Sequence, residues 1–141
     1  MVTVHEAKEL PGGDLPDPPD PYVKMYLLPN REKKSKRKTD AKKDTVTPIF
    51  DENFEYENLP IAKLQQNLKL EVTVWDNKGV FSRGAVMGRV IIELSEIPQK
   101  RIDNQWFDLV EVDEDSDWRK KSFLRRTFQR SKKSKTISIL K

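Results

Sequence analysis

The sequence predicts an all-β protein with an antiparallel β-sandwich fold, and three observations support this class. Short segments rich in β-branched and aromatic residues recur along the chain, separated by clusters of proline, glycine and asparagine. Apolar and polar residues alternate within these segments, which is the period of a half-buried strand. Helical periodicity is confined to about one turn around residues 61–66 and to the C-terminal tail. Many short strands with few helices are typical of a sandwich.

Seven strands are expected in the body of the chain, and the tail offers an eighth. A proline-rich loop, PGGDLPDPPDP, follows the first strand, which lies around Val2 and Val4. The next strands are predicted at Tyr22–Leu28, Ser35–Thr39, Asn53–Glu57, Leu68–Trp75, Arg89–Leu94 and Gln105–Val110. We assign residues 1–112 to the sandwich, 113–135 to a connecting segment and 136–141 to a final strand, because Ile137 and Ile139 alternate with polar residues.

Alternation also assigns the faces of the strands. The inward side chains are expected to be Val23, Met25 and Leu27 in one strand and Leu68, Leu70, Val72 and Val74 in another. Lys69, Glu71, Thr73 and Trp75 then point away from the core. If neighbouring strands share a sheet, one exposed cationic and aromatic surface gathers Tyr22, Lys24, Lys36, Lys38 and Trp75. The alternative is that the aromatic side chains simply cover a sheet edge.

Composition excludes several classes of function. The chain has 141 residues, of which 35% are hydrophobic, and this suits one domain with a modest core. It has no cysteine, which excludes disulfides and thiolate chemistry, and its single histidine, His5, is a poorly placed general base. Most enzyme classes are therefore unexpected. No apolar run approaches the ~18 residues of a transmembrane span, and the first residues lack the pattern of a secretory signal.

The net charge of +4 is unevenly distributed. Residues 1–112 carry 17 basic and 19 acidic side chains, a net of −2, whereas residues 113–141 carry 10 basic and 4 acidic, a net of +6. The run REKKSKRKTDAKK at residues 31–43 has 8 basic and 2 acidic residues, also a net of +6. Such density predicts a surface for anions, although a solvated charged face is the alternative.

The sequence resembles a C2 domain of the synaptotagmin, RIM scaffold and class II phosphoinositide 3-kinase kind. The matching segments, in the order and at close to the spacing of the family, are PDPPDPYVKMYLLP, KSKRKTDAKKDTVTPIFDENFEY, LKLEVTVWD, MGRVIIEL and WFDLV. They cover roughly residues 1–112 and leave the tail unmatched. The resemblance implies an eight-stranded antiparallel sandwich whose loops at one end meet membranes. The family has a circularly permuted topology, in which a C-terminal strand lies beside the first matched strand.

Many members of the family hold Ca²⁺ through five aspartates in two loops. Asp14, Asp20 and Asp76 match three of them, but Lys78 stands where a fourth is expected, and Gly84 or Ala85 stands in place of the fifth. Ca²⁺ requires six to eight oxygen ligands, so we expect Ca²⁺ binding to be weak or absent. We further expect Lys78 to neutralise Asp14, Asp20 and Asp76 in place of the ion. The alternative is that Asp20 and Asp76 serve to cap turns.

The family also has a lysine-rich groove for phosphatidylinositol bisphosphate, and Tyr22, Lys24, Lys36, Lys38 and Trp75 match its residues. We also expect Val80, Phe81 and Arg83 to form a loop tip that enters the lipid interface, unless Phe81 packs back onto the sandwich. The resulting expectation is a non-catalytic, cytoplasmic module, peripheral at membranes that carry anionic lipid. A scaffold for acidic protein partners and a residual Ca²⁺-dependent phospholipid binder remain alternatives. No nucleic-acid motif is present, so no nucleic-acid partner is expected.

The tail begins with acidic residues 113–117 and continues with the basic segment WRKKSFLRRTFQRSKKSK. This composition is typical of an amphipathic helix at a membrane or of a calmodulin target, and equally of a disordered linker. Beyond it, we expect residues 136–141 to return to the sandwich as the last strand. The alternative is a free tail, with the missing strand supplied by residues upstream in a longer protein.

Overall fold

The structure, a computed structural model, describes residues 2–56, 68–78, 85–94, 106–111 and 135–140. These residues form β1 (Val2–Lys8), β2 (Pro21–Leu28), β3 (Arg37–Lys38), β4 (Ile49–Phe54), β5 (Lys69–Asp76), β6 (Ala85–Glu93), β7 (Trp106–Asp108) and β8 (Thr136–Leu140). A short 3-10 helix, η1 (Lys33–Ser35), precedes β3. Within these ranges no helix has the length and apolarity needed to cross a bilayer.

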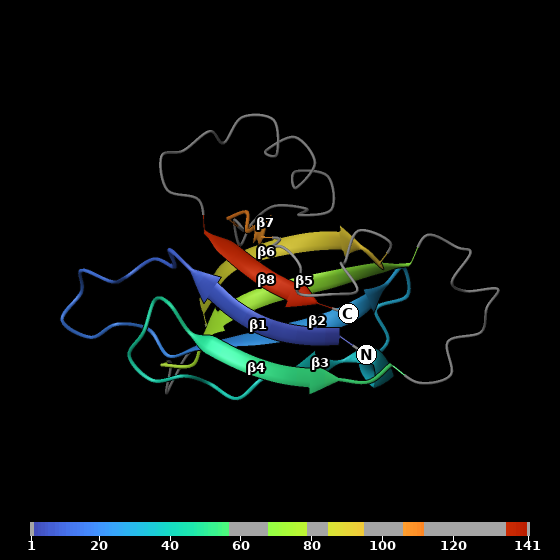
Figure 1. Ribbon diagram of the computed structural model, residues 1–141, viewed down its shortest axis with the longest axis horizontal. Coiled ribbons are helices and arrows are strands. Elements are labelled where there is room, and N and C mark those ends of the chain that lie inside the picture. The colour runs from blue at the N-terminus through green and yellow to red at the C-terminus, as the bar shows by residue number, and fades with distance from the viewer. Residues whose placement is uncertain (1, 57–67, 79–84, 95–105, 112–134, 141) are drawn as a thin grey trace.

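Two four-stranded sheets pack against each other, one ordered β4-β1-β8-β7 and the other β3-β2-β5-β6 (Figure 1). All the strand pairs are antiparallel. The core between the sheets contains the inward side chains that alternation predicts, and Val23, Met25, Leu70, Val72 and Val74 are fully buried. The predicted antiparallel eight-stranded sandwich is therefore confirmed.

The C-terminal strand lies inside the first sheet rather than at its edge. β8 runs alongside β1 and pairs with β7 on its other side (Figure 1). Ile137 and Ile139 are 0% exposed, so this strand contributes directly to the core. The expectation that Thr136–Leu140 completes the sandwich is correct, and a free tail is wrong for these residues. The predicted helix or linker at 113–134 falls outside the described residues.

Four strands differ from the sequence prediction by more than one residue, because pairing with neighbours overrides the local pattern. β4 is Ile49–Phe54 rather than Asn53–Glu57, since it follows β1 from Glu6, opposite Ile49, to Val2, opposite Phe54. β6 begins at Ala85 because it pairs along the whole of β5. β3 is cut to two residues by η1. β7 ends at Asp108, after which Val110 bridges to Arg89 of β6.

The outer face of the second sheet is less exposed than alternation predicts. Glu71 and Thr73 do lie on the face opposite the core, yet they are 2% and 8% exposed. Thr73 is covered because its hydroxyl donates to the carbonyl of Lys24 and accepts from the indole of Trp75. Glu71 is covered by two arginine side chains that bond to it. Side chains that fold across a sheet can therefore bury its outward residues.

Candidate functional site

The structure brings the predicted cationic and aromatic residues together on the outer face of the second sheet. We call this surface the basic face and define it as Tyr22, Lys24, Lys36, Lys38 and Trp75. Tyr22 of β2 lies opposite Trp75 of β5, and Lys24 lies opposite Lys38 of β3. Lys36 directly precedes β3 and is exposed. The central strand β2 therefore supplies the middle of the face, and its two neighbours supply the sides.

Lys24 is the best-defined cation of the basic face. Its ammonium lies 4.3 Å from the ring centroid of Trp75 and 6.0 Å from that of Tyr22, while the ammonium of Lys38 lies 5.9 Å from the Tyr22 ring. These are cation-π distances. A hydrogen bond of 2.8 Å from the indole nitrogen of Trp75 to the Thr73 hydroxyl fixes the ring that Lys24 covers.

The lysines of the basic face repel one another. Partial burial lowers the pKa of Lys24, and the positive charges of Lys36, Arg31 and Lys38 lower it further. Across the described ranges, Lys24, Lys36 and Lys38 take part in no ion pair. Because like charges are held together without an acidic partner, the face creates a local positive potential that favours a multivalent anion.

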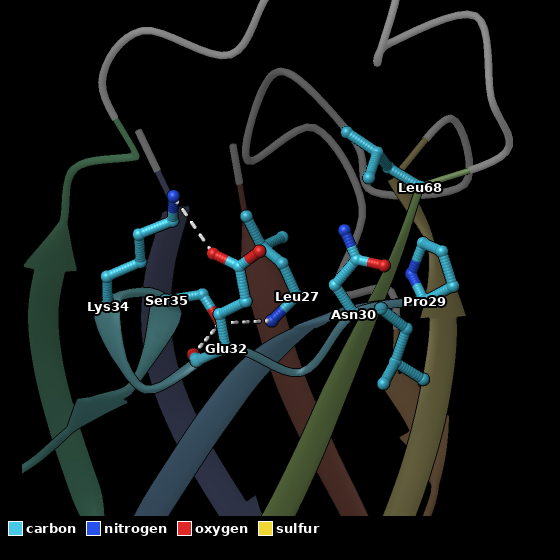
Figure 2. A pocket seen from close by; sticks show the side chains of 8 residues that line it. Leu27, Pro29, Asn30, Glu32, Lys34, Ser35 and Leu68 are labelled. Carbon is cyan, nitrogen blue, oxygen red and sulfur yellow. Dashed lines mark hydrogen bonds and ion pairs between the residues drawn. The ribbon is translucent and has the colours of Figure 1, made fainter.

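Two buried hydroxyl groups hold Lys36 and Lys38 in place. The Ser35 hydroxyl accepts from the backbone N–H of Leu27 at 3.1 Å and donates to the carbonyl of Glu32 at 2.7 Å (Figure 2). The Thr39 hydroxyl accepts from the N–H of Val23 at 2.9 Å. Lys36 and Lys38 lie between these two attachments. A strand of only two residues is thereby fixed to β2, and its lysines are fixed with it.

A small apolar pocket of about 80 Å³ lies at the end of β2 near Leu28 (Figure 2). Its walls are Leu27, Leu28, Pro29, Asn30, Glu32, Lys34, Ser35 and Leu68. Leu27 and Leu68, expected in the core, are half-buried at this rim. Typical ligand pockets have volumes of roughly 300–1,000 Å³. The pocket is therefore too small for a lipid headgroup, and the basic face is the better candidate site.

The opposite end of the sandwich gathers the acidic residues and Lys78. The Lys78 ammonium bonds to the carboxylates of Asp17 and Asp44 and lies 3.5 Å from Asp20. The hydrogen bonds that the Lys78 ammonium donates to Asp17 and Asp44 raise the pKa of Lys78 above its ordinary value. The expectation that Lys78 neutralises aspartates is right for Asp20. Its other partners are Asp17 and Asp44 instead of Asp14 and Asp76, because the Asp76 carboxylate turns toward backbone N–H groups.

Asp20 and Asp76 organise the loops through the backbone. One oxygen of Asp76 accepts from the N–H groups of Asp20 and Lys78, both at 3.0 Å. An oxygen of Asp20 accepts from the N–H of Asp44 at 2.8 Å. Asp76 therefore caps a turn, as the alternative interpretation proposed, whereas the Asp20 carboxylate joins its loop to the loop that holds Asp44. Asp14 is exposed in the loop between β1 and β2.

This arrangement does not fit Ca²⁺. An ammonium group bonds to the carboxylates that would have to turn toward the ion, and Ca²⁺ requires six to eight oxygen ligands. Among the described residues, no group of three or more histidine or acidic side chains is arranged to hold a metal ion. The loop end is a set of carboxylates joined by an internal cation.

The third predicted surface, the loop tip of Val80, Phe81 and Arg83, falls outside the described residues. At the same end of the sandwich, Leu15 is 56% exposed between Asp14 and Pro16. The sequence reasoning missed Leu15, although a single large apolar residue within a proline-rich polar loop is a recognisable signal. It included Arg31 in the basic run 31–43 but did not place its side chain over Tyr26, beside the basic face.

Comparison with known proteins agrees with this architecture. A family model described as "C2 domain" matches residues 1–109. Human extended synaptotagmin-1 is 41% identical over 96 residues, which cover 67% of this chain and 8% of that protein. Drosophila synaptotagmin 1 is 38% identical over 112 residues, which cover 79% of this chain and 23% of that protein. The chain thus spans less than a quarter of these relatives.

A solved structure of a C2 domain is also similar to this chain. The crystal structure of a C2 domain of RIM from Drosophila superposes with a TM-score of 0.59 at 32% identity, covering 67% of this chain and 75% of that chain. Sequence, topology and these relatives agree that the chain belongs to the C2 domain family.

Proposed function

We propose that this C2 domain is a non-catalytic module that attaches to membranes peripherally, recognises anionic phospholipid, phosphoinositide in particular, and does so without Ca²⁺. The observation that carries the proposal is the crowding of Lys24, Lys36 and Lys38 with no acidic partner among the described residues, with Lys24 and Lys38 beside aromatic rings. Lysine ammonium groups are point-charge donors to phosphate oxygens, and the aromatic rings provide an apolar wall for a sugar ring.

Family membership supports the coarser part of the proposal. Its relatives include synaptotagmins, extended synaptotagmins and RIM, and the C2 family is one of membrane- and lipid-binding modules. The positive potential of the basic face suits the negative potential of a cytoplasmic leaflet, where each basic residue near the surface contributes about 1 kcal/mol.

Independence from Ca²⁺ is proposed from the contacts of Lys78. A bound Ca²⁺ normally supplies the positive charge that draws the loop end toward an anionic membrane. Here the Lys78 ammonium already supplies a cation to Asp17, Asp20 and Asp44. We therefore expect membrane attachment to depend on the basic face and to change little with Ca²⁺.

Co-sedimentation with vesicles tests the proposal. Vesicles with and without phosphatidylinositol bisphosphate are compared in Ca²⁺ and in chelator. Lys36→Ala with Lys38→Ala should weaken binding by about 1 kcal/mol per lysine, and raising the salt concentration should weaken it further. The matched control is Lys33→Ala with Lys34→Ala, which removes the same charge from η1, outside the basic face.

Three results would reject parts of the proposal. Unchanged sedimentation of the Lys36 and Lys38 variant would reject the basic face as the lipid site. Calorimetry that gave micromolar Ca²⁺ affinity would reject independence from Ca²⁺. If the wild type ignored lipid altogether and instead bound acidic proteins through the basic face, the domain would be a protein scaffold.

A further inference from the structure

A buried charge network lies on the outer face next to the basic face. The Glu71 side chain is 2% exposed and bonds to two arginines, one at each oxygen. Its Oε1 accepts from Arg31 Nε at 3.2 Å, and its Oε2 accepts from a terminal nitrogen of Arg89 at 2.9 Å. Two guanidinium groups therefore share one carboxylate.

Of the two arginines that bond to Glu71, Arg31 is the one that solvent reaches. The Arg89 side chain is 5% exposed, whereas that of Arg31 is 41% exposed. Arg89 alone suffices to balance the charge of Glu71. Within the described part of the chain, only Nε of Arg31 has a bonded partner, and its two terminal nitrogens have none. The two terminal nitrogens of the Arg31 guanidinium are therefore available to donate to a ligand.

The position of Arg31 is fixed on three sides. Its guanidinium carbon lies 4.1 Å from the ring centroid of Tyr26, and its backbone N–H donates to the carbonyl of Leu27 at 2.9 Å. Its backbone has a φ of 48°, in the left-handed region that reverses the chain at this turn. The turn carries the side chain back over β2, onto the outer face, and Glu71 holds it there.

Arg31 and the basic face border the same space. Tyr26 is the next outward residue of β2 after Lys24, about 6.6 Å along a strand. The positive charge of Arg31 is among those that lower the pKa of Lys24, which requires the two groups to be close. If Lys24 and Lys38 bind one phosphate of an inositol ring, Arg31 is therefore within reach of a second phosphate on the same ring.

We propose that Arg31 forms a second phosphate subsite at the Tyr26 end of the basic face, so that the surface selects an inositol ring with two phosphates over one with a single phosphate. This inference rests on the proposed function. Lys24 and Lys38 bind the first phosphate beside Trp75, and Arg31 binds the second. A guanidinium offers a planar pair of donors that matches two phosphate oxygens, which lysine cannot reproduce. Glu71 is a positioning residue for Arg31.

The test compares binding to vesicles that carry phosphatidylinositol bisphosphate with binding to vesicles that carry the monophosphate at equal total charge. Arg31→Ala should weaken binding to the bisphosphate roughly threefold to tenfold more than binding to the monophosphate, since a charged hydrogen bond is lost. Lys34→Ala removes one charge from the same turn, where it pairs with Glu32, and should lower both affinities by the same factor. An unchanged ratio in Arg31→Ala would overturn the inference.

A charge-conserving pair protects the test against misfolding. Arg31→Lys keeps a cation for Glu71 but removes the planar pair of guanidinium donors. It should also lower the ratio of bisphosphate affinity to monophosphate affinity. Arg37→Lys is its control, because every Arg37 nitrogen donates to a backbone carbonyl and none faces a ligand. Both variants should keep the unfolding midpoint of the wild type within a few degrees, and equal ratios in the two would contradict the subsite.

The inference and the proposed function fail in different ways. If Lys36→Ala with Lys38→Ala leaves both lipids bound as before, the proposed function fails. If that variant loses both lipids while Arg31→Ala leaves the ratio unchanged, only the second subsite fails. Competition by free inositol trisphosphate separates the sources of phosphate. If free inositol trisphosphate displaces the wild type and Arg31→Ala from vesicles at equal concentrations, Arg31 does not bind headgroup phosphates.

Discussion

At the scale of single residues, Lys78 shows how one substitution changes the chemistry of a whole loop end. A carboxylate at this position would add an oxygen ligand and a negative charge, whereas the ammonium adds a positive charge and three donors. Those donors bond to Asp17 and Asp44 and approach Asp20, so two loops are tied to the residue that follows β5. The ammonium group of Lys78 thus cross-links the loop end.

The pKa of Lys78 gives this cross-link a testable dependence on pH. Hydrogen bonds with Asp17 and Asp44 raise the pKa of Lys78 in the folded state above the ordinary value of 10.5. Its stabilising effect is therefore fully present below the unfolded pKa and is lost as the pH rises through the folded pKa. Between about pH 10 and pH 12, the unfolding midpoint of the wild type should therefore fall further than that of Lys78→Gln.

Circular dichroism melts of both proteins across this range provide the measurement. Lys43→Gln is the control, because Lys43 is an exposed lysine in the loop between β3 and β4. Its alkaline loss of stability should match that of the wild type. Parallel curves for the wild type and Lys78→Gln would mean that the Lys78 contacts contribute nothing to folding.

At the scale of elements, β3 shows how a very short strand can carry a site. Its two residues alone offer few ladder hydrogen bonds, and the hydroxyl of Thr39 compensates by accepting from the N–H of Val23. The N–H of Thr39 in turn donates to the carbonyl of Val23 at 2.9 Å. Thr39 is 2% exposed, so water cannot replace these bonds. The placement of Lys36 and Lys38 therefore depends on a residue that touches no ligand.

Thr39→Val tests this dependence. The substitution keeps the shape but leaves the N–H of Val23 without its acceptor, which should cost roughly 1–3 kcal/mol of unfolding free energy. It should also weaken binding to bisphosphate vesicles, because β3 is less firmly held. Thr3→Val is the matched control, since its exposed hydroxyl bonds to Asn53 and its loss should change stability by less than about 0.5 kcal/mol. Urea unfolding that showed equal losses for both variants would contradict the role of Thr39.

The strands and loops differ in how well the sequence predicts them. The outward set of β2 and the inward set of β5 could be predicted, because side-chain direction in a strand is a local property with a period of two. The extent of β4 could not, since its register is set by β1, far away in sequence. The partners of Lys78 and the return of Arg31 over Tyr26 depend on how loops fold, and no local periodicity encodes that.

At the scale of the whole molecule, the placement of charge matters more than its sum. Residues 1–112 have a net charge of −2, so attraction to an anionic surface cannot come from the sum of the charges in the sandwich. The proposed function assigns this attraction to the lysines on the outer face of the second sheet, while acidic residues gather at the loop end around Lys78. Because the two regions lie on different parts of the sandwich, the domain is expected to approach a membrane in a preferred orientation.

The sandwich as a whole depends on its C-terminal strand. β8 separates β1 from β7, so its loss would divide the first sheet and uncover the core beneath Ile137 and Ile139. Ile139→Ala should cost about 2–5 kcal/mol of unfolding free energy, as expected for truncating a fully buried isoleucine. Ile49→Ala is the matched control, because Ile49 is 57% exposed and its truncation should cost less than about 0.5 kcal/mol. Deleting residues 136–141 should lower the unfolding midpoint further than either substitution. Equal midpoints for Ile139→Ala and Ile49→Ala would mean that β8 does not belong to the folded core.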